Sequence, residues 1–227
     1  MSSTASSPGS SRRTRRLRHH LSLAAASTVV LAAGVSFLDG DLRTRTSLAL
    51  AWAAMAGLTA TLCLGPLTLL RGRPHPVSSD LRRDLGIWTA VLALVHTGVG
   101  LTVHFRGRMH LYFLAPPDQQ IPGPIRLDLF GITNHLGLIA AILLAGLALI
   151  SSDRWLARLG TTRWKRWQRT AYVAVILTVV HGLVFQFLER RAAGLVAGLA
   201  LLILLIAVAQ ILGVREHRRR RGAVREP

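Results

Sequence analysis

The sequence contains few acidic residues, and this shortage helps to decide whether the protein is soluble or membrane-embedded. Only 10 of its 227 residues are Asp or Glu, against 28 Lys or Arg, and charged residues together make up 17%. Hydrophobic residues make up 51%, and the mean hydropathy is positive. These proportions indicate an integral membrane protein rather than a soluble domain.

Cysteine is also nearly absent, since Cys63 is the only one. A disulfide within the chain is therefore excluded, and so is covalent attachment of a c-type heme, which needs a Cys-x-x-Cys-His motif. The chain also lacks a Gly-x-Gly-x-x-Gly fingerprint after a strand, so no dinucleotide-binding unit is expected. Any heme would be held without covalent bonds.

The net charge of +18 does not indicate a nucleic-acid partner. The basic residues cluster between long apolar runs, where they would face the anionic headgroups of membrane lipid. We therefore expect membrane lipid as a partner and no nucleic acid.

Six apolar runs approach or exceed the roughly 20 residues that cross a hydrocarbon core of about 30 Å. They cover residues 21–38, 47–70, 85–104, 127–150, 168–188 and 192–214. Because lipid cannot satisfy backbone polar groups, each run is predicted to be a helix. The fold class is therefore an all-α integral membrane protein with a six-transmembrane helix bundle. The first run follows five arginines and fits either a retained helix or a cleaved signal peptide.

The basic residues predict the orientation of the bundle. One side of the six runs carries 21 Lys or Arg and the other carries seven. By the positive-inside rule, both termini are cytoplasmic and the protein lies in the plasma membrane as a multi-pass protein. The expected organisation is a disordered basic tail at 1–20, a transmembrane domain at 21–214 and a basic cytoplasmic tail at 215–227. The inner loop at 151–167 carries tryptophans that we expect at the membrane interface.

Three of the nine histidines lie in the interior of apolar runs, where lipid makes an unpartnered imidazole costly. At about 1.5 Å rise per residue, His96, His135 and His181 each lie roughly 10–12 Å from the outer end of their run. We interpret His96 and His181 as the axial ligands of one b-type heme iron. His135 is either a third ligand candidate or a polar neighbour. Each histidine could instead hydrogen-bond a neighbouring helix.

The surroundings of these histidines suit a porphyrin. Gly98 and Gly100 follow His96 and would allow close approach to the backbone. Residues three or four positions from His181 share its face of the helix and could pack against the porphyrin. These neighbours are Leu177, Thr178 and Phe185. Three outer arginines could pair with the heme propionates. These are Arg106, Arg108 and Arg126.

Three local patterns resemble the ferric reductase-like transmembrane domain family over about residues 81–188. They are RRDLGIWTAVLALVH, HLGLIAAILLAGLALISSDRWLARLG and WKRWQRTAYVAVILTVVH. Within that family, the chain resembles most the branch of heme-binding membrane subunits of periplasmic methionine sulfoxide reductase systems. The resemblance implies that His96 and His181 are heme ligands. Gln168 and Arg82 stand where relatives carry further histidines, which implies one heme near the outer face.

The leading functional prediction is a membrane heme b subunit that transfers electrons to an extracytoplasmic acceptor protein. Because we expect no flavin or nucleotide domain in the chain, a separate donor must supply electrons, either a quinol or a flavin such as FMN. It would thus be an oxidoreductase component. One alternative is direct reduction of ferric ion or another metal near His104 and His110. Another is a heme-free transporter or scaffold protein.

Overall fold

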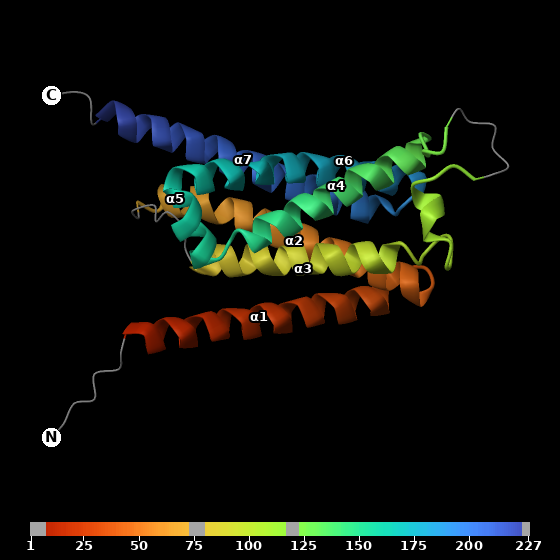
Figure 1. Ribbon diagram of the computed structural model, residues 1–227, viewed down its shortest axis with the longest axis horizontal. Coiled ribbons are helices and arrows are strands. Elements are labelled where there is room, and N and C mark those ends of the chain that lie inside the picture. Colours follow the sequence, from red (N-terminus) through yellow and green to blue (C-terminus); the bar gives the residue numbers. More distant parts are fainter. Residues whose placement is uncertain (1–7, 73–79, 117–122, 224–227) are drawn as a thin grey trace, which may run out of the picture.

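The computed structural model describes residues 8–72, 80–116 and 123–223, which form an elongated helical bundle (Figure 1). In chain order the elements are α1 (Pro8–Phe37), α2 (Leu42–Leu70), α3 (Asp80–Gly100), the 3-10 helix η1 (Met109–Tyr112), α4 (Leu129–Leu149), α5 (Asp153–Gln168), α6 (Thr170–Leu188) and α7 (Ala193–Ala223). Within these residues the only β-pairing is an isolated bridge between Leu114 and Ile125. The all-α prediction is confirmed.

Five stretches of the described chain are long and apolar enough to cross a membrane. They are α1, α2, α4, the continuous α5–α6 segment and α7. Helix α3 is not among them, because it opens with the charged run from Asp80 to Asp84. It nevertheless lies within the bundle, packed against α2 and α4 (Figure 1). The predicted count of six spans therefore depends on α3 and stays a prediction.

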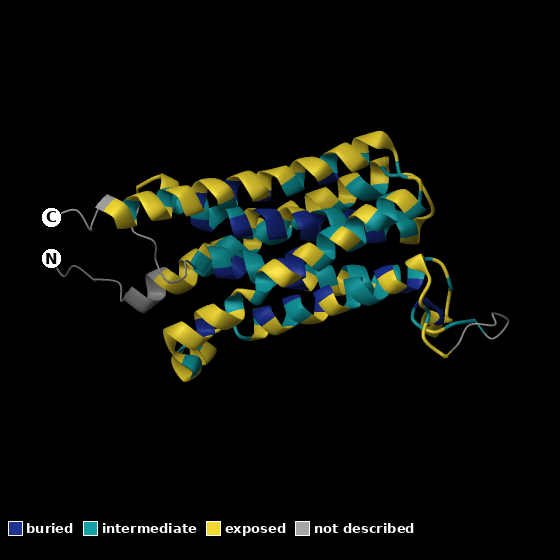
Figure 2. Ribbon diagram, turned by 90° about the horizontal axis from the view of Figure 1, so that it is seen from above, coloured by how far each residue is buried: buried dark blue, intermediate teal, exposed yellow. Residues whose placement is uncertain are grey.

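Helix α2 lies at the centre of the bundle and packs against α3, α7 and α1, while α4 packs against α6. Their facing side chains form the core, and outward-facing side chains are exposed although most are apolar (Figure 2). The core consists of Met55, Leu58, Leu62, Ala90, Leu144, Ala174, Val175, Leu199 and Ile206. Apolar residues on both the inside and the outside are expected of a bundle surrounded by lipid.

Side-chain caps fix where α2 and α4 begin. The Asp41 carboxylate accepts a hydrogen bond from the backbone N–H of Thr44 at 2.9 Å. The Asp128 carboxylate accepts one from Gly131 at 2.7 Å. Each cap satisfies a backbone donor that the first helical turn leaves without a partner.

The N-terminal segment differs from the predicted disordered tail at 1–20, because helix α1 already begins at Pro8. Ion pairs with α3 hold this end of α1. Arg12 and Arg15 contact Asp80 at 2.8 and 2.6 Å, and Arg16 contacts Asp84 at 2.7 Å. Hydrogen bonds from Arg12 and Arg15 hold the pKa of the Asp80 carboxyl well below its usual range. Residues 1–7 lie outside the described chain.

The predicted inner loop at 151–167 is largely helical. Ser152 caps α5, and Gly160 turns its axis with a positive φ of 67°, which costs glycine little. Trp164 is buried rather than interfacial, and its indole N–H donates to the Ile150 carbonyl at 2.9 Å. Trp155 and Trp167 are exposed, as membrane-interface tryptophans would be in the absence of lipid.

The predicted C-terminal tail from residue 215 continues α7 as far as Ala223. Glu216 pairs with Arg219 and Arg220 one helical turn on, at 2.9 and 2.7 Å. Arg220 also donates to the Leu69 carbonyl of α2 at 2.7 Å. These contacts extend the helix beyond its apolar run.

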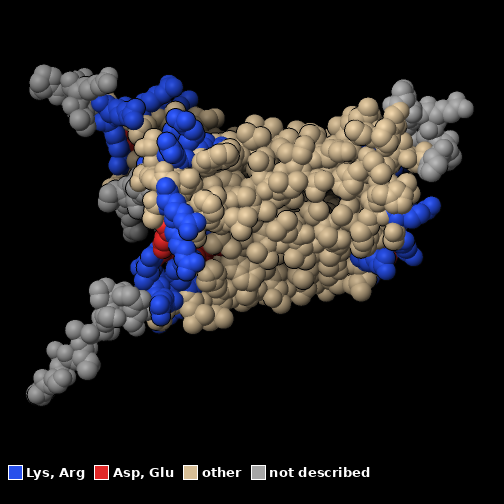
Figure 3. Space-filling model, in the orientation of Figure 1, with Lys and Arg blue, Asp and Glu red and all other residues tan. Residues whose placement is uncertain are grey.

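On the face that Figure 3 shows, charged side chains gather at the two ends of the bundle and the middle is uncharged. The end with more Lys and Arg is also the end where both termini lie (Figures 1 and 3). This arrangement is the one that the positive-inside rule associates with cytoplasmic termini. The cytoplasmic orientation stays a prediction.

Replacing Asp84 tests whether charge pairing fixes α1. Its carboxylate is fully buried and also contacts His19 of α1 at 3.0 Å. We expect Asp84→Asn to lower the free energy of unfolding by about 1–3 kcal/mol, since it weakens charge-assisted hydrogen bonds. Thermal unfolding in detergent measures the change, with the exposed Asp39→Asn as the matched control. Equal stability of the two variants would contradict this role.

Candidate functional site

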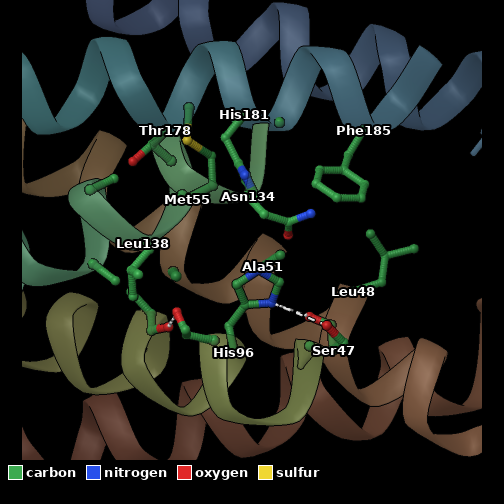
Figure 4. Close-up of a pocket in the computed structure, with 18 of the residues that line it drawn as sticks. Ser47, Leu48, Ala51, Met55, His96, Asn134, Leu138, Thr178, His181 and Phe185 are labelled. Atoms are coloured by element: carbon green, nitrogen blue, oxygen red, sulfur yellow. Dashed lines mark hydrogen bonds between the residues drawn. The ribbon is translucent and has the colours of Figure 1, made fainter. Parts of the chain in front are cut away.

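A pocket opens inside the bundle between α2, α3, α4 and α6, and His96 and His181 both line it. Figure 4 shows the two imidazoles extending into the pocket from α3 and α6. Most of the surrounding walls are apolar. The labelled apolar residues are Leu48, Ala51, Met55, Leu138 and Phe185 (Figure 4).

The two imidazole rings lie close together at a steep angle. Their centroids are 6.3 Å apart and their planes make an angle of 77°. His96 lies four residues before the end of α3, and His181 lies seven before the end of α6. Helix α3 thus ends earlier than the predicted residue 104, yet the rings reach a common level.

Each ring is oriented by a backbone carbonyl on a neighbouring helix. Nδ1 of His96 lies 2.9 Å from the Ser47 carbonyl oxygen of α2. Nδ1 of His181 lies 2.9 Å from the Thr133 carbonyl oxygen of α4. Because a carbonyl oxygen can only accept, Nδ1 must carry the proton in both rings. A neutral imidazole then has its lone pair on Nε2, which is the state that binds a metal ion.

The spacing of the rings suits one metal ion held between them. A metal–imidazole nitrogen bond is about 2 Å long and the ring centre lies roughly 1 Å further, so two opposed imidazoles on one ion have centroids about 6 Å apart. The observed 6.3 Å agrees with this value. Together with the apolar walls, the two imidazoles fit a bis-histidine heme.

Gly137 of α4 provides the space that the His181 ring occupies. A Cβ atom built at this position would lie 2.5 Å from Nδ1 and 2.6 Å from Cε1 of His181. Such distances are too short for non-bonded atoms, so any side chain here would displace the ring. The sequence did not single out Gly137, although the HLGL pattern contains it.

His135 does not line the pocket with the other two histidines. Its Nδ1 lies 2.7 Å from the carbonyl oxygen of Gly131 in its own helix. Its ring packs against Phe113 at 5.3 Å between centroids. The polar side chain that enters the pocket from α4 is the adjacent Asn134 (Figure 4).

An aromatic cluster lies at the outer end of the pocket, and Tyr112 of η1 is buried within it. The Tyr112 hydroxyl donates to the Gly100 carbonyl at 2.8 Å and accepts from the His104 backbone N–H at 2.9 Å. Burial raises the pKa of this phenol. The cluster includes His104, Phe105, Tyr112 and Phe130. It ties the segment after α3 to the start of α4.

The three arginines that were expected to pair with the heme propionates do not line the pocket. Arg126 pairs with Asp128 at 2.8 Å and stacks on Phe130, and Arg106 faces Asp41 at 3.4 Å. Arg108 is exposed. The arginine that lines the pocket is Arg191, at the α6–α7 connection, which the sequence did not single out.

Only some of the other residues named from the sequence line the pocket. Gly100, Thr178 and Phe185 line the pocket, whereas Gly98 and Leu177 do not. Gln168, which stands where relatives carry a histidine, contacts the Ser151 hydroxyl at 3.4 Å.

The two outer histidines, considered for direct metal reduction, lie apart from any metal-binding group of the described chain. His104 faces Glu189 at 3.3 Å, and His110 lies in η1. The described residues contain no group of three or more His, Cys, Asp or Glu arranged to hold a metal ion.

The family of the chain follows from its match to a family model. The model of the ferric reductase like transmembrane component matches residues 50–179, which is more than half of the chain. The chain belongs to this family. The match includes His96 and His135 and ends two residues before His181. Together with its five apolar helices, it makes this ferric reductase-like chain a multi-pass inner-membrane protein.

The chain is also similar to a protein with a more specific name than the family. The protein-methionine-sulfoxide reductase heme-binding subunit MsrQ of Caulobacter vibrioides is 29% identical over 155 residues. That alignment covers 55% of this chain and 72% of the relative. No solved structure matches the chain significantly.

Substitution at Gly137 tests the close packing against His181. We expect Gly137→Ala to destabilise the protein by about 1–3 kcal/mol, because the ring must move away from the Thr133 carbonyl. Gly146→Ala is the matched control in the same helix, since nothing lies within 4 Å of a Cβ there. The control is expected to be neutral or slightly stabilising. Thermal unfolding in detergent measures both variants, and equal melting temperatures would contradict the packing.

Proposed function

We propose that this ferric reductase-like chain is a membrane heme b electron-transfer subunit, with His96 and His181 as the two axial ligands of one heme. The observation that carries the proposal is the pair of neighbouring imidazoles, 6.3 Å apart between centroids, each with Nδ1 bonded to a backbone carbonyl. This bonding leaves Nε2 of each ring available to a metal ion. The name of the Caulobacter relative, a heme-binding subunit, supports the same cofactor.

When bound, heme supplies a one-electron couple whose potential depends on its axial ligands and surroundings. The residues of the chain hold and insulate it. The carbonyls of Ser47 and Thr133 orient the two imidazoles, and the apolar walls exclude water from the site. If His96 and His181 both held the iron, no coordination site would stay open for oxygen, and electron transfer would be favoured over oxygen activation.

The position of the pocket limits which donors fit the proposal. It extends to His104 and Glu189, which follow the ends of α3 and α6. These helix ends lie at the end of the bundle opposite the termini (Figure 1). With cytoplasmic termini, this end faces the extracytoplasmic side. Electrons would then come from a quinol in the bilayer or from a flavin such as FMN near the inner end. They would leave to an extracytoplasmic acceptor protein.

His135 has no ligand role in this proposal. Its Nδ1 bonds within α4, and its ring packs on Phe113, but His135 does not itself line the pocket. We therefore propose a single heme with two histidine ligands. His135 serves as a useful control because it lies in an apolar helix at a similar predicted depth.

Optical spectra of purified variants test the ligands. Wild-type protein reduced with dithionite is expected to give a b-type heme spectrum. His96→Ala and His181→Ala should each abolish the low-spin spectrum or lower heme content at least tenfold, because each removes one iron–nitrogen bond. His135→Ala should retain the wild-type spectrum and heme content. Heme per protein is measured by the pyridine hemochrome assay.

The same spectra can contradict the proposal in two ways. Heme-free wild-type protein from heme-sufficient cells would contradict heme binding itself. Full low-spin heme in both His96→Ala and His181→Ala would contradict the ligand assignment. Elution of each variant as a monodisperse peak in size-exclusion chromatography separates loss of heme from loss of folding.

A further inference from the structure

The pocket that His96 and His181 line has charged side chains at its outer mouth and none at its inner end. The residues of the mouth come from three parts of the chain. They are Thr44, His104, Gln186, Glu189 and Arg191. The inner end is lined by small and branched apolar residues, among them Ala54, Leu58, Ala93, Ala140 and Leu144. A ligand with one charged edge and one apolar edge would bind with the charged edge outward.

Gln186 has an amide oxygen that is buried without a hydrogen-bond partner. Leaving a buried polar atom without a hydrogen-bond partner is unfavourable. A polar group of a bound ligand would remove this cost. Because the oxygen and nitrogen of an amide can exchange places by rotation, Gln186 can present N–H donors to an acceptor at the same position.

Arg191 supplies the positive charge of the mouth. Its side chain is four-fifths buried, with an exposed fraction of 20%. The distance from its Nη2 to Oε2 of Glu189 is 3.8 Å, which is too long for a hydrogen bond. The other Glu189 oxygen lies 3.3 Å from Nε2 of His104, so this carboxylate is shared between two basic side chains. A planar guanidinium can bind a further carboxylate with two parallel hydrogen bonds.

We propose that Arg191 and Gln186 form a carboxylate-binding subsite that holds the propionates of the heme and so orients it with its propionate edge toward the outer mouth. This inference rests on the proposed function, because it assigns the cofactor's charged edge within the same pocket. It replaces Arg106, Arg108 and Arg126 as propionate partners, since none of these three lines the pocket.

The test compares two probes that share the porphyrin and iron but differ in the charge of the two side chains at issue. Hemin carries two propionates, and hemin dimethyl ester carries neutral esters in their place. Both are titrated into heme-depleted full-length protein in detergent, and the quenching of tryptophan fluorescence reports binding, because Trp52 lines the pocket. The proteins are wild type, Arg191→Gln, Arg191→Lys and the control Arg106→Gln, whose side chain is 72% exposed.

We expect Arg191→Gln to weaken hemin binding about tenfold to a hundredfold, the range of a charge-assisted hydrogen bond. Wild type should prefer hemin over the dimethyl ester by a similar factor, and Arg191→Gln should lose most of that preference. Arg191→Lys should restore part of it, because it keeps the charge but not the planar fork. Arg106→Gln should bind both probes as wild type does.

Loss of the preference for hemin in Arg106→Gln rather than in Arg191→Gln would overturn the assignment of Arg191. An unchanged preference in Arg191→Gln, with a normal low-spin spectrum, would overturn the subsite while leaving the histidine ligands in place. Failure of wild type to bind either probe would instead contradict the proposed function. A monodisperse size-exclusion peak confirms that each variant is folded.

Discussion

Two hydrogen bonds between helices are the constraint on which the rest of the site depends. Each joins Nδ1 of a histidine to a backbone carbonyl, from His96 to Ser47 and from His181 to Thr133. They fix the tautomer and the direction of each ring, because a carbonyl cannot donate a proton. Without them, a lone imidazole in an apolar helix could rotate and present either nitrogen. With them, Nε2 of each ring is left available to bind the one iron that we propose.

The packing of the bundle places those carbonyls where the rings need them. Helix α2 packs on α3 and α4 packs on α6, so each histidine faces the neighbour that orients it. Gly137 keeps α4 close to the His181 ring, and Tyr112 anchors the segment that follows α3. Stability and site geometry therefore depend on the same helix contacts, and the charged cluster around Asp84 secures α1 at the other end.

The sequence predicted the parts of this arrangement that have a local signal. Long apolar runs predicted the helices. His96 and His181 were recognised as candidate ligands because they lie inside two of these runs. It missed features that depend on the fold. Backbone carbonyls carry no sequence signal, and Arg191 enters the pocket only because of the α6–α7 connection. The basic composition of 151–167 suggested a loop, but burial of Trp164 and the Ser152 cap favour helix α5. Likewise, the expected N-terminal tail is helical from Pro8, and its arginines pair with α3, a contact that the sequence does not reveal.

Electron paramagnetic resonance of the oxidised protein tests the central claim most directly. Two axial imidazoles leave ferric iron low-spin, and ring planes that are nearly perpendicular keep two of its d orbitals close in energy. The angle of 77° between His96 and His181 therefore predicts a strongly anisotropic low-spin signal. A high-spin signal from the oxidised, heme-loaded protein would contradict ligation of one iron by both histidines.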